Sequence, residues 1–170
     1  NRRYMEEALA LEVARSARSG SPLCVVMCDV DHFKRINDQF GHLYGDEVLI
    51  LLARIMRDSF RHQDRLFRFG GEEFVVILRA ACEDEVQNAL ERFRLAVEAY
   101  AFPQVGQVTA STGYTRITPT DTIPEIVGRA DEALYFAKEN GRNQVASYET
   151  LRVAGKVSVR EKPDSDIELF

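Results

Sequence analysis

The sequence of 170 residues lacks any uninterrupted apolar run long enough to span a lipid bilayer. It also lacks a visible secretory signal, because the opening Asn1-Arg2-Arg3-Tyr4 is not followed by an apolar segment. These two absences predict a cytoplasmic domain. In the full-length protein, we expect any membrane anchor, sensor or regulatory domain to lie N-terminal to it.

Cysteines are also few, and acidic residues outnumber basic ones. Three cysteines without a CxxC pair give neither a disulfide framework nor a zinc site, and the even spacing of Cys24 and Cys28 in an apolar run predicts core thiols. A net charge of −5 argues against nucleic-acid binding, which usually needs a basic face. It leaves room for a nucleotide whose phosphates a metal ion bridges to acidic side chains. The absence of GxxxxGK[ST] argues against a P-loop GTPase.

Hydrophobic periodicity divides the chain into helices and strands. Helices are predicted at residues 5–18, 31–40, 43–60, 83–100 and 123–140, and strands at residues 23–30, 65–69, 74–78, 107–117 and 143–148. The central β-α-β-β-α-β order is that of the split βαβ, ferredoxin-like folds. We therefore expect an α+β domain whose mostly antiparallel sheet is covered by helices on one face.

Residues 150–170 do not fit this plan. Their charged, proline-containing composition predicts a linker or mobile tail, which places the domain at residues 1–149. A short strand at residues 157–159 is the alternative for part of this segment.

Two pairs of carboxylates stand out because the predicted fold can bring them together. Asp29 and Asp31 follow the first strand, and Glu72 and Glu73 lie in a predicted hairpin turn. In a split βαβ fold the first strand can lie beside this hairpin, and adjacent unpaired carboxylates repel, so a metal ion is their natural occupant. Each pair alone is more typical of a helix cap or a solvated turn. The turn also contains Gly70-Gly71, which tolerates positive φ and close approach of a ligand to the backbone.

Five segments resemble, in the right order, the motifs of the GGDEF family of diguanylate cyclases. They are residues 68–74 (RFGGEEF, the GGEEF form of the signature), 29–38 (DVDHFKRIND), 40–46 (FGHLYGD), 130–138 (ADEALYFAK) and 141–143 (GRN). The likeness covers residues 1–147. It implies a palm-like fold similar to nucleotidyl cyclases and an enzyme that joins two GTP molecules into cyclic di-GMP and two pyrophosphates.

The resemblance implies a metal site and a catalytic group. Asp29 through its carboxylate, Val30 through its carbonyl and Glu72 would hold Mg²⁺, or Mn²⁺ in its place. Glu72 is also the implied base for the ribose 3′-hydroxyl, with Glu73 assisting beside it. Lys34 would neutralise phosphate charge in the transition state.

The resemblance also implies a set of GTP-binding residues: Asn37, His42, Asp46, Gly70, Gly71, Lys138 and Arg142. Asp46 suits guanine, because one carboxylate can accept the two adjacent N–H donors of that base. Lys138 and Arg142 would hold the β- and γ-phosphates and share a face if their helix persists through Gly141. The alternative for this pair is a solvated C-terminal turn.

A second site is implied by Arg61-His62-Gln63-Asp64, which resembles the RxxD inhibitory site of the family at its usual spacing. Arg61, Asp64 and a partner arginine, Arg92, would bind cyclic di-GMP and produce inhibition by the product. The alternative is an ordinary surface ion pair.

Since one domain would hold one GTP, two copies must meet through their active-site faces as a C2 homodimer.

Two rival functions remain open at this point. A catalytically silent GGDEF domain would act as a receptor for GTP or cyclic di-GMP, and a pure interaction module would bind no nucleotide. The first is disfavoured by the intact carboxylates at positions 29 and 72 and the intact Lys34.

Overall fold

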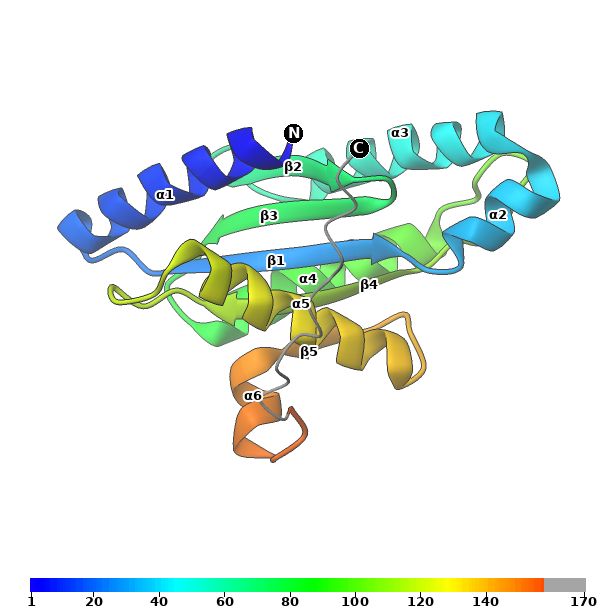
Figure 1. Cartoon of the computed structure of the whole chain (residues 1–170). Helices are drawn as coiled ribbons and strands as arrows, with labels where there is room; N and C mark the ends of the chain where they lie inside the picture. Colours follow the sequence, from blue (N-terminus) through cyan, green and yellow to red (C-terminus); the bar gives the residue numbers. More distant parts are fainter. Residues whose placement is uncertain (158–170) are drawn as a thin grey trace, which may run out of the picture.

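The first strand, β1 (Leu23–Val30), is buried along its whole length, because its apolar side chains pack into a core on each face of the sheet. The computed structural model describes residues 1–157, and β1 lies at the centre of its sheet (Figure 1). The strand order is β2-β3-β1-β4-β5, with β2 (Arg65–Gly70), β3 (Glu73–Arg79), β4 (Ala110–Arg116) and β5 (Val145–Ser147). β1 pairs antiparallel with β3 and β4, and only β4 and β5 are parallel. The predicted α+β fold with a mostly antiparallel sheet is confirmed.

Six helices accompany the sheet in the described part of the chain. They are α1 (Arg2–Ser19), α2 (Phe33–Phe40), α3 (His42–Ser59), α4 (Glu83–Ala99), α5 (Ile123–Glu139) and α6 (Tyr148–Val153). The start of α5 follows from local chemistry, because Thr122 and Glu125 form a capping box and Pro124 occupies the first turn. Among residues 1–157, no helix combines the length and the hydropathy that crossing a membrane requires.

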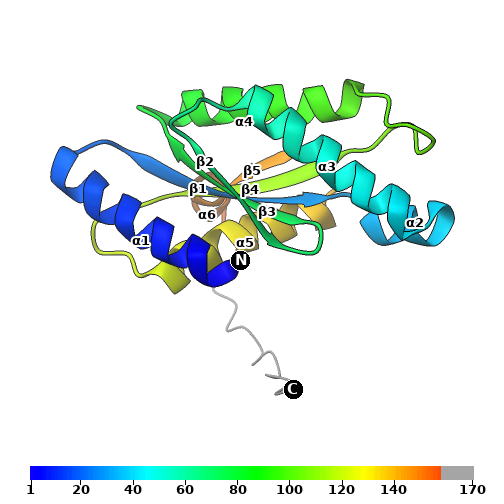
Figure 2. The ribbon, with the colours of Figure 1, turned by 90° about the horizontal axis from the view of Figure 1, so that it is seen from above.

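Helices cover both faces of the sheet, so the prediction of a single covered face was wrong. Figure 2 shows α3 and α4 on one side of the strands and α1 and α5 on the other. Val26 and Cys28 of β1 belong to the core under α3 and α4, whereas Val25 and Met27 belong to the core under α1 and α5. A continuous apolar run, rather than an alternating one, is the pattern of a strand buried on both faces.

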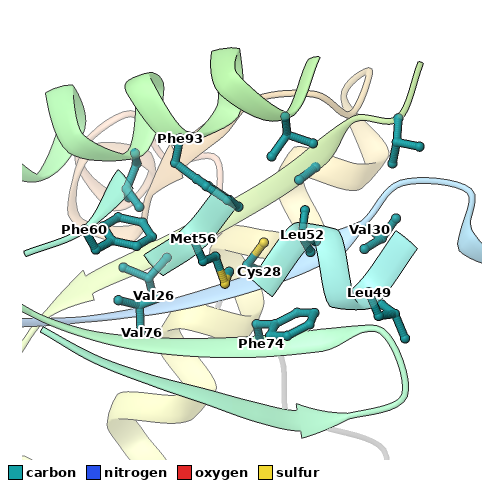
Figure 3. Close-up of a cluster of buried hydrophobic side chains, with 14 of the residues drawn as sticks. Val26, Cys28, Val30, Leu49, Leu52, Met56, Phe60, Phe74, Val76 and Phe93 are labelled. Carbon is teal, nitrogen blue, oxygen red and sulfur yellow. The ribbon is translucent and has the colours of Figure 1, made fainter. Parts of the chain in front are cut away.

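The larger core lies between the sheet and the α3–α4 pair. Figure 3 shows side chains of β1 and β3 packing against Leu52 and Met56 of α3 and Phe93 of α4. Cys24 and Cys28 are buried as predicted, and desolvation raises the pKa of the Cys24 thiol to about 12. These thiols are therefore protonated core side chains at neutral pH.

The end of the domain differs from the prediction. Helix α6 crosses the boundary expected at residue 149, and its Leu151 is buried against Ala133 and Ala137 of α5. Leu151 thus anchors this helix to the domain, so residues 150–153 are not a linker. The short strand considered at residues 157–159 lies largely outside the described residues.

Arg129 of α5 forms hydrogen bonds that connect this helix to the end of β4. Arg129 donates hydrogen bonds to both carboxylate oxygens of Asp121 at 3.0 and 2.7 Å, to Thr115 Oγ1 at 3.0 Å and to the Arg116 carbonyl at 3.0 Å. The hydrogen bonds from Arg129 lower the pKa of Asp121 below its ordinary value, and hydrogen bonding with Thr118 adds to the effect. The network joins β4, the following loop and α5.

We expect Asp121→Asn to lower the free energy of unfolding by roughly 1–3 kcal/mol at pH 7, because a charge-assisted hydrogen bond is lost. A carboxyl whose folded pKa is depressed stabilises the protein above its unfolded pKa of about 4, and that contribution is lost as pH falls through the folded pKa. The difference between variant and wild type in urea unfolding should therefore shrink as pH falls below about 4. Glu6→Gln, which removes an exposed ion pair with Arg2, is the control and should change stability by less than about 1 kcal/mol. A pH-independent difference for Asp121→Asn would contradict the assignment.

Candidate active site

The two predicted carboxylate pairs converge at one end of β1. Asp29 is the register partner of Glu73 across the β1–β3 pair, which places the hairpin turn beside the end of β1. Asp29 and Glu72 line the same cavity of about 620 Å³. The cavity is also lined by Val30, Asp31, His32, Phe33, Lys34, Arg35, Asp38, Gln39, Lys138 and Arg142.

Asp29 is the buried charge at the base of this cavity, with an exposed fraction of 3%. Lys138 Nζ donates a hydrogen bond of 2.5 Å to Asp29 Oδ2. Burial raises the pKa of Asp29 to about 6, the lysine opposes that rise, and the charges of Glu72 and Glu73 add to it. A nearby cation favours the ionised form of this buried carboxylate, and Lys138 supplies one.

The oxygen atoms and the electrostatics of this cavity fit a divalent cation. The donors offered by Asp29, Val30 and Glu72 are all oxygens, which Mg²⁺ prefers, and Mg²⁺ usually takes only one or two carboxylates and completes its shell with water and substrate phosphate. The burial and mutual repulsion of the carboxylates favour a positive ion. Within residues 1–157, no group of three or more His, Cys, Asp or Glu side chains is placed to hold a metal ion, so a cation here would also need other oxygen ligands, such as a backbone carbonyl, water or substrate phosphate.

The hairpin that carries Glu72 is held by Arg68. Its Nε and Nη2 donate hydrogen bonds of 3.1 and 2.8 Å to the Gly71 carbonyl. Neither Gly70 nor Gly71 is among the described residues with positive φ, so the backbone conformation does not require glycine there. A Cβ on Gly71 would meet no atom within 4 Å. The glycines therefore leave open space beside the turn, in which a ligand could approach the backbone.

Helix α2 begins at the rim of the cavity. Its N-cap, His32, has a left-handed φ of 56° and makes no side-chain capping hydrogen bond. The first amides of an uncapped helix lack intrahelical partners and attract anions. His32 is exposed and lines the cavity together with Lys34 and Arg35.

Lys138 and Arg142 both line the cavity, although their helix does not persist through Gly141. Helix α5 ends at Glu139, and Gly141 has a φ of 112°, so the two side chains do not lie on one continuous helix. The chain instead turns through left-handed conformations that bring Arg142 back to the cavity.

Asn37, His42 and Asp46, which the resemblance places in the GTP site, do not line this cavity. Asn37 lies on α2, and His42 and Asp46 lie in the first turns of α3, which packs against α2. The buried Asn37 Oδ1 has no hydrogen-bond partner within the described chain. Gly45, which the sequence reading did not single out, makes this arrangement possible, because a Cβ there would lie 1.9 Å from Asn37 Oδ1.

The three residues predicted for the inhibitory site line a second cavity, of about 230 Å³, between β3 and α4. Arg61 forms an exposed ion pair with Glu85 at 3.7 Å, and Arg92 donates to the Ser59 carbonyl at 2.8 Å. Asp64 already accepts hydrogen bonds from the backbone N–H groups of Arg61 and Arg79 at 2.9 and 3.2 Å. Asp64 therefore organises the turn as well as facing the cavity.

These features define an α+β domain in which carboxylates and basic side chains from distant segments of the chain line one cavity. The family model "Diguanylate cyclase, GGDEF domain" matches residues 1–144, and the chain belongs to the GGDEF domain family. The predicted family is thereby confirmed, and membership implies a divalent-metal cofactor.

Curated relatives agree with this membership. Diguanylate cyclase DgcP of Pseudomonas aeruginosa is 44% identical over 148 residues, and diguanylate cyclase DosC of Escherichia coli is 38% identical over 149 residues. Each alignment covers 85% of this chain but only 22% of DgcP and 32% of DosC. The chain thus spans about a quarter to a third of the length of these relatives.

Solved structures share the fold. The GGDEF domain of DgcB from Caulobacter crescentus, in complex with c-di-GMP, has a TM-score of 0.83 at 31% identity over 88% of this chain and 91% of that one. The active GGEEF domain of a diguanylate cyclase from Vibrio cholerae has a TM-score of 0.81 at 35% identity over 87% and 96%. The second comparison pairs this chain with an active domain that carries the same GGEEF form of the signature.

Proposed function

We propose that this domain is an active diguanylate cyclase, which condenses two GTP molecules into cyclic di-GMP and two pyrophosphates. The observation that carries the proposal is the meeting of Asp29 and Glu72 at one cavity that also contains Lys138 and Arg142. Such a cavity supplies the charge neutralisation and positioning on which phosphoryl transfer depends.

The side chains divide the work by position. Lys138 and Arg142 bind the β- and γ-phosphates of GTP, and Lys34 neutralises charge on the transferring group. Asn37 and Asp46 hold guanine between α2 and α3, near His42. The 3′-oxygen of one GTP attacks the α-phosphorus of the other, Glu72 accepts the proton of that hydroxyl with Glu73 beside it, and pyrophosphate leaves.

Asp29, the Val30 carbonyl and Glu72 would hold a magnesium ion, which would supply positive charge to neutralise the phosphates during transfer. The domain binds one GTP, so synthesis needs two copies that meet through their active-site faces. The active species is a C2 homodimer, and the rate should rise with the square of domain concentration when the dimer is transient.

The test is a direct assay of cyclic di-GMP formation from GTP and Mg²⁺ over a series of protein concentrations. Product that increases with time and requires the cation supports an active cyclase. GTP or cyclic di-GMP binding without product at any concentration would indicate the silent receptor instead, and no nucleotide binding would indicate an interaction module.

Inhibition by the product is part of the same proposal, at the cavity lined by Arg61, Asp64 and Arg92. We expect Arg61→Ala to leave the initial rate within about twofold while weakening inhibition by added cyclic di-GMP at least about tenfold, since an arginine–phosphate contact is lost. Arg54→Ala, an exposed arginine of α3 outside this cavity, is the control. The measurement is the initial rate against added cyclic di-GMP. Equal inhibition of wild type and Arg61→Ala would reject the site.

A further inference from the structure

The turn after α5 has an unfavourable backbone conformation. Gly141, Arg142 and Asn143 have φ angles of 112°, 61° and 45° in succession. Positive φ suits glycine, but residues with a Cβ adopt it rarely, and two in a row persist only where surrounding contacts hold them. Because Arg142 lines the active-site cavity, the contacts that hold this turn bear on the proposed reaction.

The strongest of these contacts comes from Asp31. Its carboxylate is 4% exposed, and its Oδ2 accepts hydrogen bonds from the Asn143 backbone N–H at 2.9 Å and from Thr109 Oγ1 at 2.7 Å. Its Oδ1 accepts from Ser111 Oγ at 2.7 Å. Three donors therefore occupy the second carboxylate of the Asp29-Val30-Asp31 segment, which points to a role other than metal binding.

Helix α4 also contacts Asn143, through the side chain of that residue. Arg94 Nη1 donates to Asn143 Oδ1 at 3.1 Å, and the Asn143 side-chain amide donates to Glu98. Arg94 is itself held by Glu91 at 2.9 Å. Asn143 is thus fixed by groups from two separate elements.

We infer that Asp31 is a positioning residue for GTP, which acts through Asn143 on Arg142. The Asn143 N–H belongs to the same planar peptide unit as the Arg142 carbonyl, so holding that N–H fixes the ψ angle of Arg142. The guanidinium is then presented to the cavity without first having to order its backbone, which lowers the entropy cost of binding phosphate. This inference rests on the proposed function, because it assigns the benefit to the β- and γ-phosphates of GTP.

The test compares two substitutions at Asp31. Asp31→Ala removes the acceptor of the Asn143 N–H. Asp31→Asn keeps an acceptor oxygen there, while its amide can donate to the Ser111 hydroxyl. A positioning role predicts that asparagine rescues what alanine loses, whereas a metal-binding role predicts that both substitutions fail, since both remove the charge.

Binding is measured by calorimetry with Mg²⁺ and two ligands: GMP, and a GTP analogue with a methylene group between the α- and β-phosphates, which cannot release pyrophosphate. We expect Asp31→Ala to weaken the analogue about tenfold and GMP by less than about twofold, and Asp31→Asn to stay within about threefold of wild type for both. In an Arg142→Ala background, Asp31→Ala should add less than about twofold, because the residue it positions is gone.

The matched control is Ser111→Ala, which removes the hydrogen bond to the other oxygen of the same carboxylate. It should lower the melting temperature but leave affinity for the analogue within about twofold. Amide hydrogen exchange in the wild type gives a readout that needs no nucleotide and no variant: the Asn143 amide should be among the strongly protected amides of the domain.

Four results would overturn the inference: an unprotected Asn143 amide, equal losses for GMP and the analogue, a full additional loss in the Arg142→Ala background, or failure of Asp31→Asn equal to that of Asp31→Ala. A wild type that binds no guanine nucleotide would contradict the proposed function, and the inference with it. That outcome is separate, because it appears before any variant is made.

Discussion

Glu72→Gln is expected to lower the rate of cyclic di-GMP formation at saturating GTP by about 10²–10³-fold. Glutamine keeps the size of the side chain but removes the charge that would accept the 3′-hydroxyl proton and help to hold the cation. The substitution also relieves repulsion, because the Glu72 charge raises the pKa of Asp29. The fold should therefore be no less stable, and the loss should appear in the rate.

The measurement is the initial rate with Mg²⁺, accompanied by thermal unfolding of the same samples. Glu7→Gln is the matched control, since Glu7 forms an exposed ion pair with Arg3 on α1 and does not line the cavity. It should retain the wild-type rate. If Glu72→Gln keeps more than about a tenth of the wild-type rate, Glu72 is not the group on which catalysis depends.

Gly113→Ala should produce the largest loss of stability. Gly113 lies on β4 under α5, and a Cβ there would lie 2.0 Å from the Leu134 backbone nitrogen and 2.6 Å from the Ala130 carbonyl oxygen. These are backbone atoms of a packed helix, so the helix itself would have to move. Overpacking of this kind costs about 3 kcal/mol or more, which corresponds to a fall in melting temperature of roughly 6–12 °C for a domain of this size.

Gly128→Ala provides a matched control on α5. A Cβ at this position would meet no atom within 4 Å, and alanine is a better helix former than glycine. We expect Gly128→Ala to raise the free energy of unfolding by about 0.5–1 kcal/mol, the opposite sign from Gly113→Ala. Both values come from thermal or urea unfolding. A Gly113→Ala domain as stable as wild type would show that β4 and α5 do not pack this closely.

Much of the fold could be predicted because its signals are local. The apolar run at residues 23–30 predicts a buried strand, and the glycine pair with its neighbouring glutamates predicts the hairpin between β2 and β3. The same run is continuously apolar, which is the pattern of a strand buried on both faces, although only one covered face was predicted. Helix α6 was missed because a segment of six residues carries too little periodicity to be recognised.

The candidate site was predicted less completely, because its contacts join distant parts of the chain. Lys138 and Asp29 are 109 residues apart, and Asn143 and Asp31 are 112 apart. Periodicity and turn chemistry describe neighbours within a few residues, so neither could show that Lys138 pairs with Asp29 or that Asp31 accepts from a backbone turn. Gly45 and Gly113 were missed for the same reason, since the atoms that exclude a Cβ belong to other elements.

The sequence by itself determined the order of elements from α1 to β5, the burial of the first strand, the hairpin with its carboxylates and the family to which the domain belongs. It did so because these properties follow from side-chain periodicity and from short motifs. Only the tertiary structure decided that Asp29 pairs with Lys138 while Asp31 holds the turn after α5, and how Arg142 reaches the cavity. Those choices depend on how the β1 end, the α5 turn and α4 pack together, and no short segment of the chain contains that information.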